Sequence, residues 1–250
     1  MPPAGEFVSR YVRRSRPVIL AGAAKDWPAR DRWTPEGLKK RFGDRVVPVI
    51  RRQSGPECDD SGQLTYAYDA MPVGDYVDAV AARRTDLYMV FRTQQSLPEM
   101  LDDVRLPDVC TRAAWFGSRF WFTMAGTGSG LHSDLPHNLY AQVVGRKQFL
   151  MVHHYQTPRV YPFPPWSGAP NFSRVDAEKP DLARFPRFAG AKLKLAELEP
   201  GDMLYIPSLY WHQARALSDS VSINLWWANG VLRQVIRAAE WFMKVRQLKL

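Results

Sequence analysis

The chain has 250 residues, of which 46% are hydrophobic and 24% charged, a composition typical of a globular protein with a sizeable core. No stretch approaches the roughly 18 apolar residues of a membrane span, so we expect no integral membrane protein. The first 16 residues carry four arginines but no apolar segment, and the two cysteines, Cys58 and Cys110, lack CxxC spacing. We therefore expect an intracellular, cytoplasmic protein without a secretory signal, a disulfide framework or a structural zinc knuckle.

The formal net charge of +9 is concentrated at the two ends of the chain. Residues 1–52 hold 13 Lys and Arg against 5 Asp and Glu, and residues 231–250 hold 5 against 1. Two interpretations are open: a basic surface for an anionic partner such as RNA, or the solvated faces of amphipathic helices. The basic residues lie in amphipathic patterns and form no dense run, which favours the second interpretation.

The first part of the chain, residues 1–119, predicts α/β elements that would support a larger β domain. Helices are expected at 6–14, 35–42 and 72–83, and strands at 18–20, 46–50 and 87–91, with a loop at 53–63. Thr34 would cap the second helix, Pro35 would occupy its first turn, and Gly43 would end it as a C-cap glycine.

From residue 120 the pattern changes to short strands separated by Gly and Pro. Strands are expected at 120–125, 131–134, 139–144, 147–153, 192–198, 203–206, 211–216 and 221–227. Such a series predicts an antiparallel sandwich or barrel over 120–230, with one long insertion at 155–191. A C-terminal helix at 231–250 completes a single predicted domain, 1–250.

Three side chains of the barrel region form a candidate metal site. His132 and Asp134 are two residues apart in a predicted strand, so their side chains would share a face. His212 is the best candidate for a third ligand. Two imidazoles and one carboxylate are the ligand set of non-haem Fe(II) oxygenases, although manganese, nickel and zinc accept the same ligands. The other three histidines are expected to be surface or packing residues: His137, His153 and His154.

Lys147 is the second unusual feature of the barrel region. It shares a strand face with Phe149 and Met151, so its ammonium group would project into an apolar interior. A buried ammonium group needs an anionic partner, and the sequence offers none nearby, whereas a bound dicarboxylate would supply one. Other side chains are expected to face the same interior: Asn138, Tyr140, Gln142, Asn224 and Trp226.

Spaced motifs connect these residues. The first group is HSD at 132–134 with Asn138, Gln142, Gly145 and Lys147. The second group is PGD at 200–202, IP at 206–207 and WH at 211–212, and the third is SINLW at 222–226. The set resembles the jumonji-C (cupin-like) Fe(II)/2-oxoglutarate oxygenases, and it is most similar to their small hydroxylase branch. That branch includes the asparaginyl hydroxylase of hypoxia-inducible factor and the tRNA wybutosine hydroxylase. The resemblance covers about residues 6–245 and implies a double-stranded β-helix, the jelly-roll barrel of the cupins.

The resemblance also implies roles for individual residues. His132, Asp134 and His212 would bind Fe(II). Lys147 would pair with the distal carboxylate of 2-oxoglutarate, and Ser129 occupies a position where the branch often has threonine. The remaining co-substrate contacts would come from Tyr88, Asn138, Asn224 and Trp226.

The expected activity is hydroxylation of a protein or peptide side chain, with succinate and CO2 as co-products. The substrate would lie beneath the insertion, clamped by Tyr161, Phe163, Trp166 and Phe172, unless these aromatic residues only pack the insertion onto the barrel. The alternatives are hydroxylation of RNA, such as a tRNA base, by the same chemistry, and a non-catalytic cupin-like binding module. A homodimer through the C-terminal helix is a further expectation.

Overall fold

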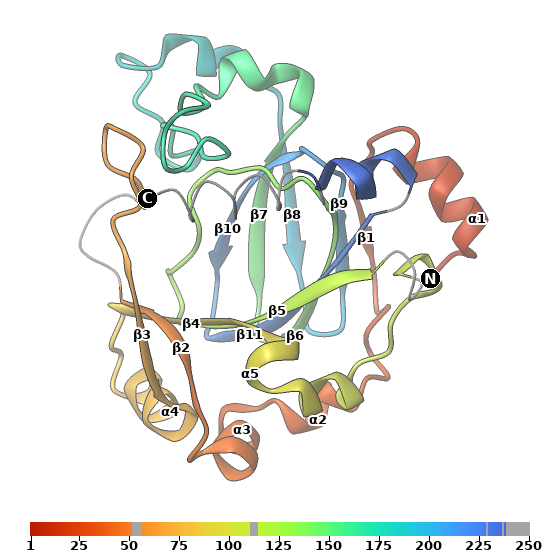
Figure 1. Cartoon of the computed structure of the whole chain (residues 1–250), viewed down its shortest axis with the longest axis vertical. Coiled ribbons are helices and arrows are strands. Elements are labelled where there is room, and N and C mark those ends of the chain that lie inside the picture. Colours follow the sequence, from red (N-terminus) through yellow and green to blue (C-terminus); the bar gives the residue numbers. More distant parts are fainter. Residues whose placement is uncertain (52–56, 111–114, 229, 237, 239–250) are drawn as a thin grey trace.

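Two antiparallel β-sheets form the body of the protein (Figure 1). The computed structural model describes residues 1–51, 57–110, 115–228, 230–236 and 238. The larger sheet has eight strands in the order β1-β9-β6-β11-β5-β4-β2-β3, and the smaller sheet has three in the order β10-β7-β8. This mainly β, jelly-roll architecture confirms the predicted fold class.

The strands of the larger sheet are β1 Val18–Leu20, β2 Val46–Arg51, β3 Ala67–Pro72, β4 Leu87–Arg92, β5 Trp115–Thr123, β6 His137–Val144, β9 Met203–Ile206 and β11 Ser220–Trp227. Those of the smaller sheet are β7 Lys147–Val152, β8 Leu193–Leu198 and β10 Trp211–Ala216. Most of these strands were predicted within a few residues. The exception is β3, which carries four exposed residues in succession and therefore no alternation of apolar and polar side chains.

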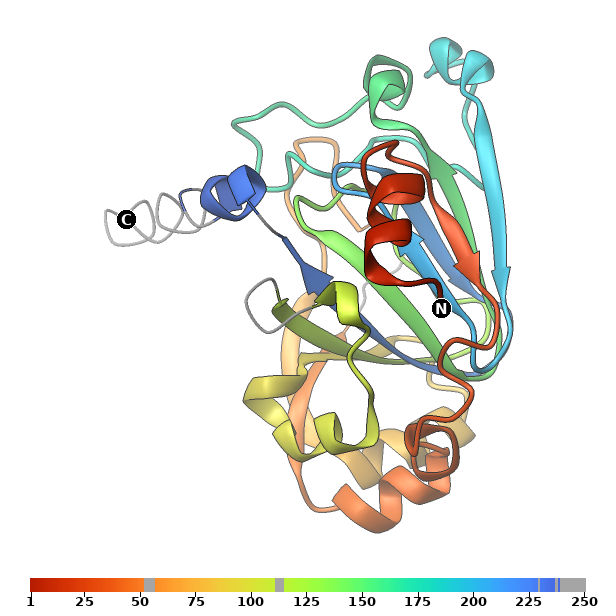
Figure 2. The same cartoon turned by 90° about the vertical axis from the view of Figure 1, so that its right-hand side faces the viewer.

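Short helices cover one side of the larger sheet (Figure 2). They are α1 Ala4–Phe7, the π-helix η1 Val8–Val12, α2 Ala29–Arg32, α3 Pro35–Phe42, α4 Val73–Ala81, α5 Thr93–Ser96, and the 3-10 helices η2 Pro98–Asp103 and η3 Asp108–Cys110. Two further 3-10 helices, η4 His154–Arg159 and η5 Pro186–Gly190, lie in the 155–191 region, which extends beyond the barrel at the top of Figure 1.

Strand alternation divides the larger sheet into two faces. In β11, Val221, Ile223 and Leu225 enter the core shared with the helices, whereas Asn224 and Trp226 face the smaller sheet. The helix-side core is rich in large side chains, each of which contributes about 1.5–3 kcal/mol when fully buried. The opposite face is more polar, and this is the face that forms the site described below.

Both ends of α3 follow the sequence prediction. The Thr34 side chain accepts a hydrogen bond from the Gly37 N–H (3.1 Å), and Pro35 occupies the first turn. The helix ends at Phe42 with Gly43 as its C-cap residue, as predicted, and the φ of Gly43 is −47°. The Gly43 carbonyl accepts a hydrogen bond from the Gly74 N–H (2.9 Å) of α4, and a Cβ on Gly74 would lie only 3.2 Å from this carbonyl oxygen.

The predicted C-terminal helix lies mostly outside the described residues. Residues 231–236 are helical and Ile236 is buried. The predicted dimer contact depends on the rest of this helix and stays a prediction. Within the described part of the chain, no helix combines the length and apolar character needed to cross a membrane.

Asp103 is the polar centre of the helix-side core. Its carboxylate is fully buried and accepts hydrogen bonds from Arg32 (2.6 Å), Arg41 and the indole of Trp33 (2.9 Å). Burial raises the pKa of Asp103, but these three donors outweigh it, so the pKa lies below its usual value. Asp103 therefore stabilises the fold above the pKa of an unfolded aspartate, and this contribution is lost as pH falls through the lowered pKa.

Replacing Asp103 with alanine is expected to lower the free energy of unfolding by about 2–4 kcal/mol, because buried donors lose a charged acceptor. Urea denaturation at neutral pH measures the change. Asp102→Ala is the matched control, since its side chain is exposed, and it should stay near the wild-type value. Equal stability of the two variants would contradict this account of Asp103.

Candidate metal centre

The structure brings His132, Asp134 and His212 together, as predicted. One ligand atom from each lies within 4.8 Å of the others, and His212 Nε2 is 3.9 Å from Asp134 Oδ2. His212 lies on β10. The predicted strand at 131–134 is wrong, because this segment is a loop before β6 that pairs only at His132. His132 and His212 exchange two backbone hydrogen bonds (3.0 and 2.7 Å), and this bridge, rather than strand alternation, aligns the ligands.

The second ring nitrogen of each histidine fixes its orientation. His132 Nδ1 lies 2.8 Å from the Gly130 carbonyl oxygen, and His212 Nδ1 lies 2.9 Å from that of Tyr210. A carbonyl can only accept, so Nδ1 carries the proton and Nε2 presents a lone pair. Burial, with His132 nearby, lowers the pKa of His212 to about 4, which keeps this imidazole neutral. Two neutral nitrogens and one carboxylate fit a divalent cation.

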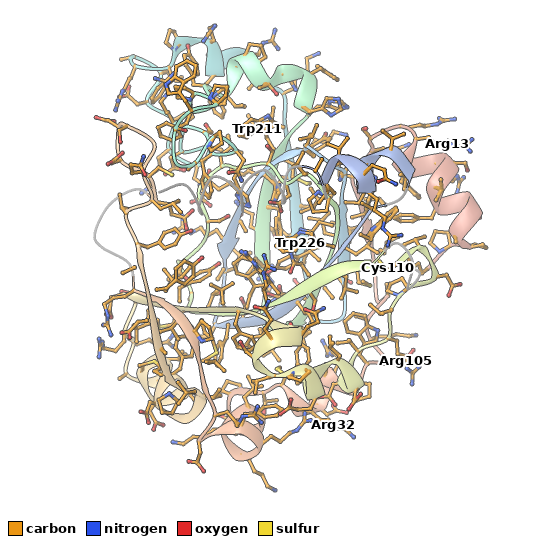
Figure 3. All side chains as sticks on the ribbon, in the orientation of Figure 1. Arg13, Arg32, Arg105, Cys110, Trp211 and Trp226 are labelled. Carbon is orange, nitrogen blue, oxygen red and sulfur yellow. The ribbon has the colours of Figure 1, made fainter. Side chains whose placement is uncertain are left out.

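A cavity of about 250 Å³ adjoins the three ligands between the two sheets. Its inner wall includes Tyr140 and Asn224 from the larger sheet and Phe149 from the smaller one. Trp226, labelled near the centre of Figure 3, also lines it. We call its less buried part the mouth, defined by Glu57, Tyr66, Tyr68, Arg119, Asn171 and Phe172.

Lys147 is buried at the start of β7, with 2% of its surface exposed. Its Nζ donates a hydrogen bond to the Tyr140 hydroxyl (2.7 Å) and lies 3.4 Å from Ser222 Oγ. Burial lowers the pKa of Lys147 to about 7. Among the described residues, no carboxylate lies within 4.0 Å of this ammonium group, so its pairing with a ligand carboxylate would satisfy an otherwise unbalanced charge.

The other predicted co-substrate residues all line the same cavity: Tyr88, Ser129, Asn138, Asn224 and Trp226. Two of them carry buried polar atoms without a hydrogen-bond partner in the described chain, namely Asn138 Oδ1 and Trp226 Nε1. Ser129 Oγ accepts a hydrogen bond from the Ala214 N–H (3.2 Å), which leaves its own proton for another acceptor. The cavity therefore presents polar groups that suit a small polar ligand.

The aromatic residues of the insertion are placed differently from one another. Phe172 stacks on His132, with 5.2 Å between ring centroids. Tyr161 packs against Phe185, Phe163 lines a second, adjoining cavity, and Trp166 is 82% exposed. The structure thus brings only Phe172 of the four to the cavity of the metal ligands. A substrate role for the other three stays a prediction.

Sequence reasoning placed Lys147 and Tyr140 in the barrel interior but missed the hydrogen bond between them, and it missed Arg119 as a residue of the cavity. The hydrogen bond depends on how the two sheets pack, since β6 and β7 belong to different sheets, and no local sequence pattern reveals this packing. Arg119 was missed because the predicted strand began at residue 120, whereas β5 begins at Trp115. A strand extended by a few residues would have placed Arg119 on the same face as Trp121.

The fold and the ligand set together define a class: a double-stranded β-helix that holds two histidines and one carboxylate at one end of its interior. The chain belongs to the cupin-like domain family, whose model matches residues 3–231. Relatives of this chain confirm its predicted resemblance to the small jumonji-C branch.

Lysine-specific demethylase 8 from Xenopus tropicalis is 32% identical over 240 residues, which cover 91% of this chain and 51% of the relative. The chain thus spans about half the length of this relative. The tRNA wybutosine-synthesizing protein 5 of Gallus gallus is 26% identical over 88% of this chain and 73% of its own. Human bifunctional peptidase and (3S)-lysyl hydroxylase JMJD7 is 25% identical over 90% of this chain and 81% of its own.

Among solved structures, that of E. coli ycfD matches with a TM-score of 0.57 over 99% of this chain and 58% of its own. At 19% sequence identity, this similarity supports the fold alone.

Proposed function

We propose that the protein is an Fe(II)- and 2-oxoglutarate-dependent oxygenase that hydroxylates a side chain of a protein or peptide, with succinate and CO2 as co-products. The proposal rests on one observation, that the candidate metal ligands and the partner of Lys147 lie on the same cavity. The two imidazoles and the carboxylate open onto the same cavity as the Tyr140 hydroxyl, which holds the buried Lys147. The ligand set suits iron, and Lys147 suits the distal carboxylate of the co-substrate. A metal-dependent hydrolase would need no such lysine.

When bound, iron and 2-oxoglutarate would supply the oxidising power that converts a substrate C–H bond into C–OH. The chain's own residues hold and orient the reactants. His132, Asp134 and His212 would hold the cation. Lys147 and Tyr140 would donate hydrogen bonds to the distal carboxylate, each worth about 1.5–3 kcal/mol. Phe172 covers one face of the His132 ring and limits the access of water to this ligand.

Hydroxylation of an RNA base by the same chemistry is the second candidate. Its support comes from the wybutosine-synthesizing relative and from three exposed arginines near the N-terminus, Arg13, Arg14 and Arg16, which form no ion pair within the described residues. Binding of tRNA that falls steeply with salt would favour it. A non-catalytic binding module is disfavoured, because all three ligands and Lys147 are present.

We infer an intracellular location, because Cys58 and Cys110 are both free and buried and therefore suit a reducing compartment. Assembly into a homodimer through the C-terminal helix stays a prediction, which sedimentation of the full chain would test.

The deciding experiment has two steps. Calorimetry first measures 2-oxoglutarate binding to the protein loaded with Fe(II) under anaerobic conditions. The loaded protein is then incubated in air with a peptide pool and, separately, with tRNA, and mass spectrometry searches for one added oxygen atom. Succinate formation that requires Fe(II) and a peptide supports the proposal. Failure of the loaded protein to bind 2-oxoglutarate would overturn it.

A further inference from the structure

The barrel interior contains a second cationic side chain, Arg119, that the proposed function leaves without a role. Arg119 lies on β5 and lines the cavity of the metal ligands. Its backbone N–H donates to Asn224 Oδ1 (2.8 Å), and its guanidinium carbon lies 5.1 Å from the centroid of the Trp226 ring. Strands β5 and β11 therefore hold this cation against an aromatic face inside the mouth.

Among the described residues, the guanidinium group of Arg119 forms no ion pair. In the part of the chain that the structure describes, no carboxylate lies within 4.0 Å of it. Its register partner on the adjacent strand β4 is a second arginine, Arg92, which is exposed and likewise forms no ion pair there. Like charges directly opposite each other destabilise a sheet, so this arrangement is a cost to the fold.

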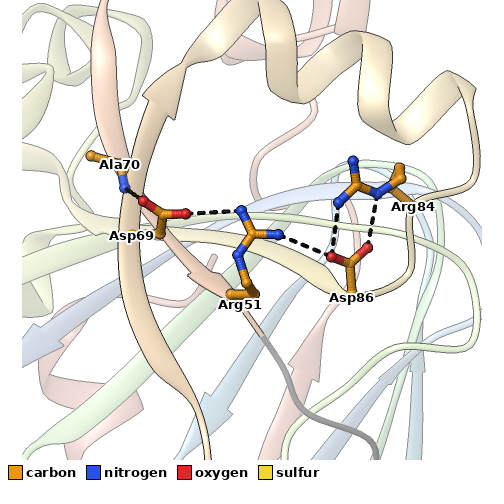
Figure 4. Close-up of polar contacts among 5 residues, drawn as sticks. All are labelled: Arg51, Asp69, Ala70, Arg84 and Asp86. Carbon is orange, nitrogen blue, oxygen red and sulfur yellow. Dashed lines mark hydrogen bonds and ion pairs between the residues drawn. The ribbon is translucent and has the colours of Figure 1, made fainter.

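Two other exposed arginines, one on the sheet and one in the turn before β4, form ion pairs (Figure 4). Arg51 on β2 forms ion pairs with Asp69 (2.9 Å) and Asp86 (3.2 Å), and Arg84 forms another with Asp86 (3.0 Å). Carboxylates thus neutralise these two exposed arginines, whereas the described residues place none within 4.0 Å of the half-buried Arg119. A half-buried cation of this kind is best explained by a ligand that brings the negative charge.

We propose that Arg119, assisted by Arg92, binds a carboxylate side chain of the peptide substrate, so that the enzyme selects peptides with Asp or Glu close to the residue it hydroxylates. This inference rests on the proposed function. The planar guanidinium suits two parallel hydrogen bonds to a carboxylate, and stacking on Trp226 fixes its plane in advance. Lys147, buried at the far end among Tyr140 and Ser222, stays reserved for the co-substrate.

Charge around the mouth favours a peptide over a nucleic acid. Glu57 lines both the mouth and the adjoining cavity, where carboxylates outnumber guanidinium groups by five to three. The five are Glu57, Asp59, Asp60, Asp176 and Glu178, and the three are Arg174, Arg184 and Arg215. A polyanionic backbone laid across this surface would be repelled, whereas a peptide can place a single carboxylate at Arg119.

The test uses the full chain loaded with Co(II) and N-oxalylglycine, an unreactive analogue of the co-substrate. A heptapeptide pool is passed over wild type, Arg119→Gln and the control Arg84→Gln, and retained peptides are identified by mass spectrometry. Fluorescence anisotropy then compares the best acidic peptide with its Asp→Asn or Glu→Gln counterpart on each variant. We expect loss of the acid to weaken binding to wild type and to Arg84→Gln by about 10- to 100-fold, and to change binding to Arg119→Gln less than twofold.

Arg119→Glu should enrich peptides with Lys or Arg instead of acidic ones. Absence of acidic enrichment by wild type, or an equal loss in wild type and Arg119→Gln, would overturn the inference. An RNA oligonucleotide that competes with the peptide and depends on Arg119 would reassign the site to a phosphate and also overturn it. Binding of 2-oxoglutarate to Fe(II)-loaded Arg119→Gln is expected to match wild type. Its absence in wild type would instead count against the proposed function.

Discussion

Replacing Asp134 with alanine is expected to weaken the binding of a divalent cation by about 10²–10³-fold and to abolish turnover. Asp134 is the one anion among the three ligands. If the roughly 10–16 kcal/mol of a four-ligand structural zinc site is shared evenly, each ligand accounts for about 2.5–4 kcal/mol. Calorimetric titration with Co(II) measures the affinity, and the visible absorption of bound Co(II) reports the ligand geometry.

Asp69→Ala is the matched control for Asp134→Ala, since it removes a carboxylate from the exposed network of Figure 4. This variant should bind Co(II) as wild type does. An Asp134→Ala protein that keeps wild-type Co(II) affinity would show that the ion binds elsewhere, and the proposed metal centre would be wrong.

Replacing Lys147 with methionine should change ligand affinity and stability in opposite directions. The variant loses the charged donor for the distal carboxylate, so 2-oxoglutarate binding should weaken by about 10- to 100-fold. It also removes a buried charge for which the described residues supply no acidic partner, so the free energy of unfolding of the ligand-free protein should rise by about 1–4 kcal/mol. Calorimetry and urea denaturation measure the two effects, and Lys194→Met on the exposed side of β8 is the control.

The same lysine predicts a pH dependence of co-substrate binding. Burial lowers the pKa of Lys147 to about 7, so the ligand-free protein increasingly lacks the ammonium charge above that pH. A dianionic ligand favours the protonated form, and binding should therefore take up a proton and weaken by up to about tenfold per pH unit above 7. The neighbouring Tyr140 and Ser222 stay neutral over this range and do not reverse the sign. Calorimetry in buffers of different ionisation enthalpy counts the protons, and Lys147→Met should show none of this uptake.

The jelly-roll could be predicted from the sequence because its strands are short and alternate or are buried on both faces, as in β6 and β9. The ligand set could be predicted because few arrangements explain an HxD motif, a distant WH pair and a lysine among apolar residues. The strand predicted for 131–134 was wrong for a physical reason. His132 forms isolated backbone bridges to His212, 80 residues later in the sequence, and to Phe172, and such long-range bridges leave no local periodicity.

Substrate-facing residues were harder to predict than ligands. Tyr161 and Phe163 have the composition of a substrate clamp, but their burial within the insertion region depends on partners such as Phe185 and Cys58 that only the folded chain brings close. Arg119 gave no signal because it lay just outside the predicted strand, where an arginine is ordinarily solvated. Its role follows only from the absence of a carboxylate within reach in the described structure.

The paired backbone bonds between His132 and His212 bear on how the protein would acquire the proposed cation. They connect the ligand-bearing loop to β10 independently of any ion, so the imidazoles keep their spacing when the cation is removed. A chelator should then remove the cation without unfolding the barrel. Rebinding of the cation should be limited only by diffusion and ligand exchange. Selectivity among cations would then depend on the fixed spacing of the ligands rather than on a rearrangement of the chain around each ion.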